Sequence, residues 1–202
     1  MIPLPKKFYN RDAAIVAREL LGCIFVKRDE EAILKGKIVE TEAYYGLSDP
    51  ASRARDRKIG MIMNGQPGIA FIYMVHGNWL FNVTTMPVGK ASGILIRAVE
   101  PLEGIEIMMK RRKKEKLTDL TSGPGKFTKA FGIDKRYNGL KIYDRHSPIY
   151  ITEARERNFE IVESHRIGVK EDLPQPLRFY IKGNKFVSKK WRIQISLHHI
   201  KG

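Results

Sequence analysis

The chain has 202 residues, of which 43% are hydrophobic, so it is long enough to bury one sizeable core. Lysine and arginine number 37 against 22 acidic residues, a formal net charge of +15. Neutralising phosphates releases counterions, so this charge favours nucleic acid as a partner, although an anionic membrane surface or simple solubilising charge would also fit it. A single cysteine, Cys23, excludes an internal disulfide and a cysteine-rich zinc site.

The N-terminus lacks the apolar run of a signal peptide, and no window is long and apolar enough to span a bilayer. We therefore expect a soluble protein of the cytoplasm, associated with the nucleoid in a prokaryote or located in the nucleus in a eukaryote. No repeat, low-complexity tract or linker interrupts the chain, so we expect one domain over residues 1–202.

The first part of the chain predicts a helix followed by two strands. Asn10 is a good N-cap, and apolar residues recur at helical spacing over residues 12–21 until Gly22. Residues 23–27 and 33–45 have the composition of strands joined by a polar turn. The stretch 46–60 is polar and rich in arginine, which is typical of a functional loop.

Residues 37–45, KIVETEAYY, carry the most informative pattern. In a strand, successive side chains alternate between faces, so Glu40, Glu42 and Tyr44 share one face. A carboxylate on a stiff strand beside an aromatic ring suits a site that stacks a flat ligand and deprotonates a water molecule. The alternative is that both glutamates merely solvate an exposed strand face.

A β-hairpin is predicted over residues 69–85, with a tight turn at 76–78 that includes Gly77-Asn78. A buried hairpin explains most of its aromatic side chains, but it explains a histidine at the tip, His76, less well. Residues 92–99 form a further apolar strand that contains Arg97. Because an isolated buried cation is costly, Arg97 needs a carboxylate partner, and Glu42 is the obvious candidate.

The second half of the chain gives weaker signals. Pro101 and Glu103 are expected to open a helix that runs into the basic cluster at 110–116, which could cap the helix or contact phosphates. The sequence SGPGK at 122–126 precedes a short helix ending near Gly132; its amides could hold a phosphate, although the P-loop pattern is incomplete. Residues 177–187 are predicted to form a closing hairpin around Gly183-Asn184.

Together these segments resemble the alkyladenine (3-methyladenine) DNA glycosylase family. The resemblance rests on motifs whose order and spacing run over nearly the whole chain: IVETEAYYG at 38–46, DPAS at 49–52, the PG and IAFIY segments at 67–73, FNV at 81–83, IRAVEPLEG at 96–104, SGPGK at 122–126, RIGV at 166–169 and LRFYIKG at 177–183.

The resemblance implies an α+β fold: a single compact domain with a curved, partly barrel-like antiparallel sheet, flanking helices and a protruding DNA-binding hairpin. It implies a monomeric enzyme that binds double-stranded DNA, flips out a damaged purine and hydrolyses its N-glycosidic bond. No cofactor or metal is expected. No lysine falls at a nucleophile position of the motifs, so we expect a monofunctional enzyme without a strand-nicking step.

The resemblance also assigns roles to single residues. Glu42 matches the general base, and Arg97 with the backbone carbonyl of Ile167 matches the groups that hold the water; Glu40 is left to support or packing. The remaining matches are the stacking walls Tyr44 and Tyr73, the guanine-excluding Asn82, the wedge His76 and the DNA-backbone contacts Arg55 and Lys126.

Three departures from the family affect what we expect of the enzyme. Arg53 stands where the family usually has a pocket histidine, which bears on substrate preference. His76 stands where the type member of the family has a tyrosine wedge, and the turn after Gly77 is one residue shorter, which bear on the efficiency of flipping. The positive charge of Arg53 should disfavour cationic bases. We therefore expect neutral lesions such as hypoxanthine to be excised alongside 3-methyladenine.

Three other functions fit parts of the sequence. A metal-dependent nuclease could use Glu40, Glu42 and Asp49, since two-metal chemistry needs convergent carboxylates. A non-catalytic module could bind DNA with the hairpin and arginines alone. A degenerate glycosylase could have lost activity through the change at Arg53.

Overall fold

The structure is a computed structural model that describes residues 1–30, 32–153 and 158–188. The sheet is built from β1 (Ile24–Arg28), β2 (Ile33–Tyr45), β3 (Ala70–Val75), β4 (Asn78–Thr84), β5 (Ser92–Glu103), β6 (Ile149–Thr152), β7 (Ile161–Ser164) and β8 (Arg178–Ile181). The α-helices are α1 (Lys6–Tyr9), α2 (Ala13–Glu19), α3 (Arg57–Met63), α4 (Ile105–Arg112), α5 (Thr118–Thr121) and α6 (Pro124–Phe131), and the 3₁₀ helices are η1 (Arg53–Arg55) and η2 (Lys135–Tyr137).

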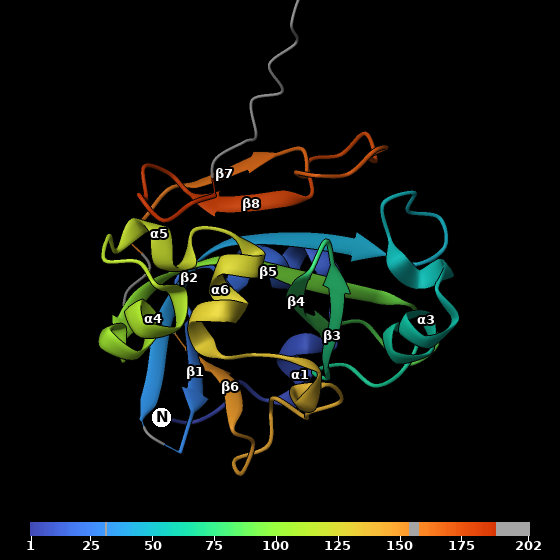
Figure 1. The fold of residues 1–202 in the computed structure, drawn as a ribbon. Coiled ribbons are helices and arrows are strands. Elements are labelled where there is room, and N and C mark those ends of the chain that lie inside the picture. Colours follow the sequence, from blue (N-terminus) through green and yellow to red (C-terminus); the bar gives the residue numbers. More distant parts are fainter. Residues whose placement is uncertain (31, 154–157, 189–202) are drawn as a thin grey trace, which may run out of the picture.

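Strand β2 organises the antiparallel sheet, whose order is β3-β4-β5-β2-β1-β6 (Figure 1). One edge of β2 pairs with β5 along most of its length. On the other edge, β1 pairs with residues 33–37 and β8 pairs with residues 40–42, and β7 adds to the outer edge of β8. Because two strands share that edge, the sheet curls into a half barrel. This confirms the expected α+β fold of a single compact domain, and β2 has the predicted bounds.

The core lies where helices α2 and α6 pack against the curled sheet. The rings of Phe25, Phe81 and Phe127 meet edge to face, with the centroid of Phe25 5.1 Å from that of Phe81 and 4.9 Å from that of Phe127. Such aromatic contacts add to the free energy gained by burial. The carboxylate of Asp12 caps α2 by accepting bonds from the next helical amides, whereas Asn10, the expected cap, ends α1.

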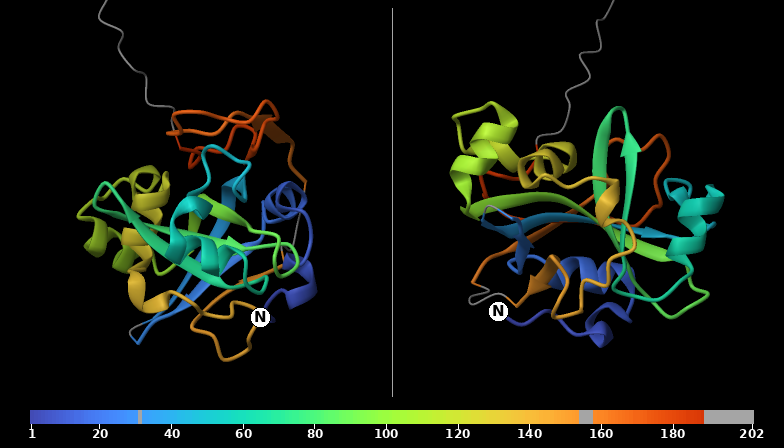
Figure 2. Two further views of the ribbon diagram at one scale, coloured as in Figure 1. Left: turned by 90° about the vertical axis from the view of Figure 1, so that its right-hand side faces the viewer. Right: turned by 60° about the horizontal axis from the view of Figure 1, so that its bottom comes forward.

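The hairpin β3–β4 rises clear of the sheet, as Figure 2 shows in its right-hand view. Its turn consists of His76 and Gly77, because Val75 pairs with Asn78. Both turn residues have positive φ, 46° and 74°. This is the requirement of a type I′ turn, whose twist matches that of the strands. The turn therefore lies one residue earlier than the predicted Gly-Asn turn, and Asn78 belongs to β4.

The structure corrects three further predictions. The stretch 46–60 contains η1 and the start of α3. Strand β5 continues through Pro101, which pairs with Gly36, so α4 begins only after Gly104. The expected closing hairpin is wrong: β8 pairs with β2 and β7, and with both edges occupied, residues 185–187 form no strand. Among the described helices, none has the length and apolar character that a membrane crossing needs.

Candidate active site

The register of the sheet brings the predicted site residues onto one face. Glu42 pairs with Leu95 of β5, Leu95 pairs with Asn82 of β4, and Asn82 pairs with Phe71 of β3. Directly paired residues in an antiparallel sheet point to the same side, so these side chains form a row across four strands. Glu42 and Asn82 are two strand spacings apart, roughly 10 Å. A flat group of nucleobase size would reach from one to the other.

Glu42 is fully buried at the β2 end of this row and accepts three hydrogen bonds. One oxygen, Oε2, accepts from the Tyr44 hydroxyl at 2.8 Å and from Nη1 of Arg97 at 3.1 Å. The other, Oε1, accepts from the backbone N–H of Ile167 at 2.8 Å. Tyr44 and Ile167 are only half-buried, so the carboxylate lies one layer of side chains below the surface. The alternative that Glu40 and Glu42 merely solvate an exposed strand face is wrong, because both side chains are buried.

The electrostatic environment makes Glu42 a stronger base than an ordinary glutamate. Burial raises its pKa above 4.5, and this effect outweighs the opposing effects of Arg97, the Ile167 amide and the Tyr44 hydroxyl, while the neighbouring Glu40 raises the pKa further. The carboxylate therefore holds a proton more tightly than it would in water. A general base near neutral pH benefits from such a shift.

Glu40 anchors the arginines behind Glu42. Its Oε1 accepts from Nε of Arg97 at 3.0 Å and from Nε of Arg178 at 2.7 Å. The hydroxyl and the amide of Ser188 complete its hydrogen bonds at 2.8 and 2.7 Å. Arg97 is 7% exposed and thus bridges two buried carboxylates, as its predicted need for a partner requires. Both carboxylates that hold Arg97 lie more than 50 residues away from it in the sequence.

Tyr44 stacks on a second buried arginine. The guanidinium of Arg166 lies 4.5 Å from the centre of the Tyr44 ring, within range of a cation–π contact. It is held by the carboxylate of Asp49 through two bonds of 2.7 and 2.8 Å, by Asp172 at 2.6 Å and by the carbonyl of Ala43 at 3.0 Å. One face of the tyrosine ring is therefore occupied, and the ring is fixed from behind.

The second predicted wall, Tyr73, lies near the other end of the face. It stacks on Phe71 with ring centroids 6.2 Å apart and planes inclined by 21°. Phe71 in turn lies over Gly93, where a Cβ atom would come within 2.8 Å of its ring, so glycine is required there. Burial raises the pKa of Tyr73 to about 12, the positive charge of Arg53 opposes this rise, and Glu42 adds to it. The exposed Arg53 and buried Glu42 are thus close enough to influence the same hydroxyl.

Asn82 is buried and its amide donates to the carbonyls of Phe71 and Leu80, both at 3.3 Å. These bonds fix the side chain between strands β3 and β4. Ile167 contacts Glu42 through its backbone N–H. No hydrogen bond from another described residue ties its carbonyl, the predicted anchor for a water molecule, to the site, so that role stays a prediction.

Two of the predicted DNA-contact residues, His76 and Lys126, lie at the hairpin tip and on the helix that supports the hairpin. The exposed tip of His76 and Gly77 is braced by α6: a Cβ at Gly125 would come within 2.7 Å of the Asn78 side chain, and the Thr128 hydroxyl donates to the carbonyl of Trp79 at 2.7 Å. Lys126 follows Gly125 directly, at the start of α6 and close to the tip.

Arg55 has a structural task besides its predicted one. Its guanidinium donates to the backbone carbonyls of Leu47, Asp49 and Pro50 at 3.0 to 3.4 Å. These bonds hold the loop that precedes η1. The side chain remains exposed, so a phosphate could still reach its outer edge.

Sequence reasoning missed Arg166, Arg178 and Ser188 as parts of the site. Arg166 and Arg178 lie in the family motifs RIGV and LRFYIKG, but the motifs alone assign no role to either arginine. Each arginine is bonded to a carboxylate more than 100 residues away in the sequence. The nuclease alternative loses one of its ligands, because Asp49 is bound to Arg166. The described residues contain no group of three or more His, Cys, Asp or Glu side chains suited to a metal ion.

Comparison with known proteins gives a consistent result. A sequence model of the family described as methylpurine-DNA glycosylase matches residues 7–185. Relatives named "Putative 3-methyladenine DNA glycosylase" cover nearly the whole chain. The protein from Aeropyrum pernix is 42% identical over 190 residues, 92% of this chain and 93% of its own length. The one from Clostridium tetani is 44% identical over 202 residues, 93% of this chain and 99% of its own.

Proposed function

Because this chain belongs to the methylpurine-DNA glycosylase family, we propose that it excises a flipped-out damaged purine from duplex DNA with a water molecule activated by Glu42. Family membership itself makes the chain a DNA glycosylase of DNA repair. The flipping, the role of Glu42 and the absence of a strand-nicking step are parts of the proposal. The chain acts on DNA as a monomer in this scheme.

The chemistry follows from the charge that develops on the sugar. Departure of the purine leaves positive charge on the anomeric carbon, as in glycoside hydrolysis. The carboxylate of Glu42 stabilises that charge and takes a proton from the attacking water. Arg97 keeps the carboxylate oriented. Tyr44 must turn or tilt for the base to approach Glu42, since its hydroxyl occupies one carboxylate oxygen.

Tyr44 and Tyr73 form the walls between which the base stacks, a contact worth about 1–3 kcal/mol per base. Asn82 lies on the same face and crowds the 2-amino group of guanine, which excludes the normal base. Arg53 adds positive charge near Tyr73. This charge favours neutral lesions, so hypoxanthine is a substrate alongside 3-methyladenine.

The hairpin supplies the flipping element. His76, held in a strained positive-φ turn at an exposed tip, fills the gap left in the duplex. Lys126 beside the tip and the outer edge of Arg55 contact the phosphate backbone. The high positive charge of the chain supports such a surface.

The observation that carries this proposal is the convergence of three donors on the buried carboxylate of Glu42, in line with Asn82 and next to Tyr44. The test is an excision assay on duplexes that carry hypoxanthine, ethenoadenine, or 3- or 7-methylated purines, with excess EDTA present. We expect base release with an intact sugar–phosphate strand. Absence of release from every lesion, or loss of release with EDTA, contradicts the proposal.

Specificity is tested separately with Arg53→His. If Arg53 disfavours cationic bases, the variant gains rate on 7-methylated purines relative to hypoxanthine. An unchanged ratio of the two rates contradicts this assignment but leaves the role of Glu42 unaffected.

A further inference from the structure

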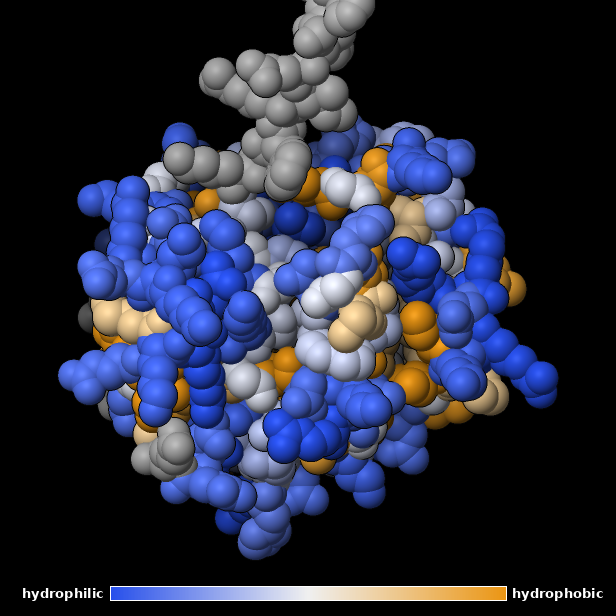
Figure 3. All heavy atoms as spheres, viewed as in Figure 1, coloured by the Kyte–Doolittle hydropathy of each residue, from blue (hydrophilic) through white to orange (hydrophobic). Residues whose placement is uncertain are grey.

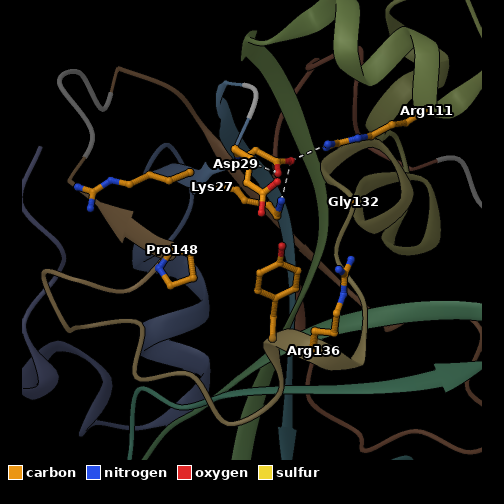
Figure 4. A pocket seen from close by; sticks show the side chains of 9 residues that line it. Lys27, Asp29, Arg111, Gly132, Arg136 and Pro148 are labelled. Carbon is orange, nitrogen blue, oxygen red and sulfur yellow. Dashed lines mark hydrogen bonds and ion pairs between the residues drawn. The ribbon is translucent and has the colours of Figure 1, made fainter.

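A polar pocket of about 440 Å³ is lined by none of the residues of the proposed excision site. It lies between β1 with its following turn, the end of α4, the C-terminus of α6 and η2 (Figure 4). Four cationic side chains line it against two acidic ones. In Figure 4, Lys27 and Arg111 reach toward Asp29 from two different elements, while Arg136 lies apart from Asp29, on η2.

The floor of the pocket holds two cations on one carboxylate. Lys27 is only 1% exposed, and its ammonium group donates to Oδ2 of Asp29 at 2.8 Å and lies 5.0 Å from the centre of the Tyr137 ring. Arg111 donates to the same oxygen at 2.6 Å. Burial alone would raise the pKa of Asp29, but its bonds to Lys27 and Arg111 lower it to about 2. Asp29 therefore stays ionised, and the floor keeps an excess of positive charge.

Arg111 also has a donor without an acceptor. Its Nη1 is inaccessible to solvent and has no hydrogen-bond partner among the described residues. The guanidinium lies against Gly132, where a Cβ atom would come within 2.9 Å of Nη1. The positive φ of Gly132 is explained by its place as the C-cap of α6, with its amide bonded to Lys129. Capping does not explain why a buried arginine donor is laid against that cap and left unsatisfied, which is a costly arrangement.

We propose that this pocket binds a phosphate group, with Arg136 at its rim and Arg111 as the principal donor. The Arg111 side chain is 26% exposed, and a turn of its guanidinium would bring Nη1 out of its buried position to face the phosphate. A phosphate carries enough charge to offset the excess on the floor and several acceptor oxygens for convergent donors. The volume lies in the range of small-molecule sites. Arg136 is paired with Asp134 and mostly exposed, so it can turn inward without loss of a buried contact.

Two sources could supply this phosphate: the backbone of bound DNA, or a free phosphate-bearing molecule. Helix α6 has eight residues and is thus about 12 Å long. It joins the hairpin contact at Gly125 to the pocket at Gly132. In Figure 3, hydrophilic side chains also gather over the α4 side of the molecule. A backbone phosphate on the flank of the duplex is therefore within the reach of the pocket.

The first experiment compares thermal unfolding of the full chain in phosphate and in chloride at equal ionic strength and pH. Lys7→Gln is the charge-matched control, because Lys7 is exposed and outside the pocket. Phosphate at about 100 times its Kd should raise the Tm of the wild type and of the control by roughly 5–10 °C. Arg111→Gln should lose this rise. Arg136→Gln should lose part of this rise. Because the Arg136 side chain is exposed, this variant should fold normally and still tests the proposal if Arg111→Gln misfolds.

The second experiment measures the salt dependence of binding to an undamaged duplex. If the phosphate belongs to DNA, Arg111→Gln lowers the slope of log K against log salt by about one relative to Lys7→Gln. If the phosphate is free, the slope stays unchanged while the thermal shift is lost. The proposal is overturned if Arg111→Gln matches Lys7→Gln in both experiments. Base excision is a separate readout, so failure here does not touch the proposed function.

Discussion

Replacement of Glu42 by glutamine keeps the shape of the side chain and removes its charge. If Glu42 is the general base, the rate of excision should fall by roughly 10²–10⁴-fold. This corresponds to about 2.7–5.4 kcal/mol in the activation barrier. Affinity for lesion-bearing DNA should stay nearly unchanged, because stacking and phosphate contacts do not depend on this charge.

The structure also predicts an effect on stability. A carboxylate accepts all three bonds from Tyr44, Arg97 and Ile167, but an amide has only one acceptor oxygen, so its NH₂ group must face a donor. An unsatisfied buried donor costs about 1–3 kcal/mol. For a chain of this length each kcal/mol lowers Tm by about 2–4 °C.

The raised pKa of Glu42 gives this effect a pH dependence. A folded-state pKa above the unfolded one contributes stability at low pH that is lost as pH rises through the folded value. Glutamine does not titrate. The stability advantage of the wild type over the variant should therefore be largest in acid and shrink as pH rises above 4.5.

The assay is single-turnover excision with enzyme in excess over a hypoxanthine duplex, together with thermal unfolding over a range of pH. Glu103→Gln serves as the matched control, because Glu103 is an exposed partner of Lys35 at the end of β5. Comparable excision by wild type and Glu42→Gln would show that another group is the base. An advantage that grows with pH would refute the reasoning about burial.

Three further changes test the supporting residues. Tyr44→Phe removes a hydroxyl that lowers the pKa of Glu42, so the acid limb of the excision-rate profile should move to higher pH; an unmoved limb argues against the bond. Arg166→Lys keeps the charge but loses the planar contact behind Tyr44. Affinity for lesion-bearing DNA should therefore drop by roughly two- to thirtyfold, while affinity for undamaged DNA stays unchanged. Equal losses of affinity for both kinds of DNA would indicate a general structural role. His76→Ala should reduce the fluorescence change of a base analogue at the flipped position, and an unaltered signal would exclude it as the wedge.

Local patterns in the sequence were sufficient for the elements that hold the catalytic face. The strand-like composition of residues 33–45 predicted the bounds of β2. The alternation in residues 37–45 predicted the shared face of Glu42 and Tyr44, because side chains in a strand repeat every two residues. The need of Arg97 for a partner followed from the cost of burying its charge. These inferences require only neighbours in sequence and one physical rule.

The parts that could not be predicted depend on contacts distant in sequence. Arg166 and Arg178 look like surface charges in their own segments, and only pairing with Asp49 and Glu40 makes their burial favourable. The short strands β6 and β7 have four residues each, too few to show a period. Likewise, Asn10 and Asp12 are by residue type equally good N-caps for α2. Asp12 has this role because α1 extends to Tyr9 and Asn10 ends it.

The contact between the hairpin and α6 determines how a force on the hairpin tip is transmitted. A force applied at His76 is passed by Asn78 to Gly125 and then along α6. Helix α6 is itself anchored in the core by Phe127, which packs among the central phenylalanine rings. The tip is therefore supported from inside the molecule, and in the proposed flipping step this support would let the tip press against stacked bases without folding back onto the sheet.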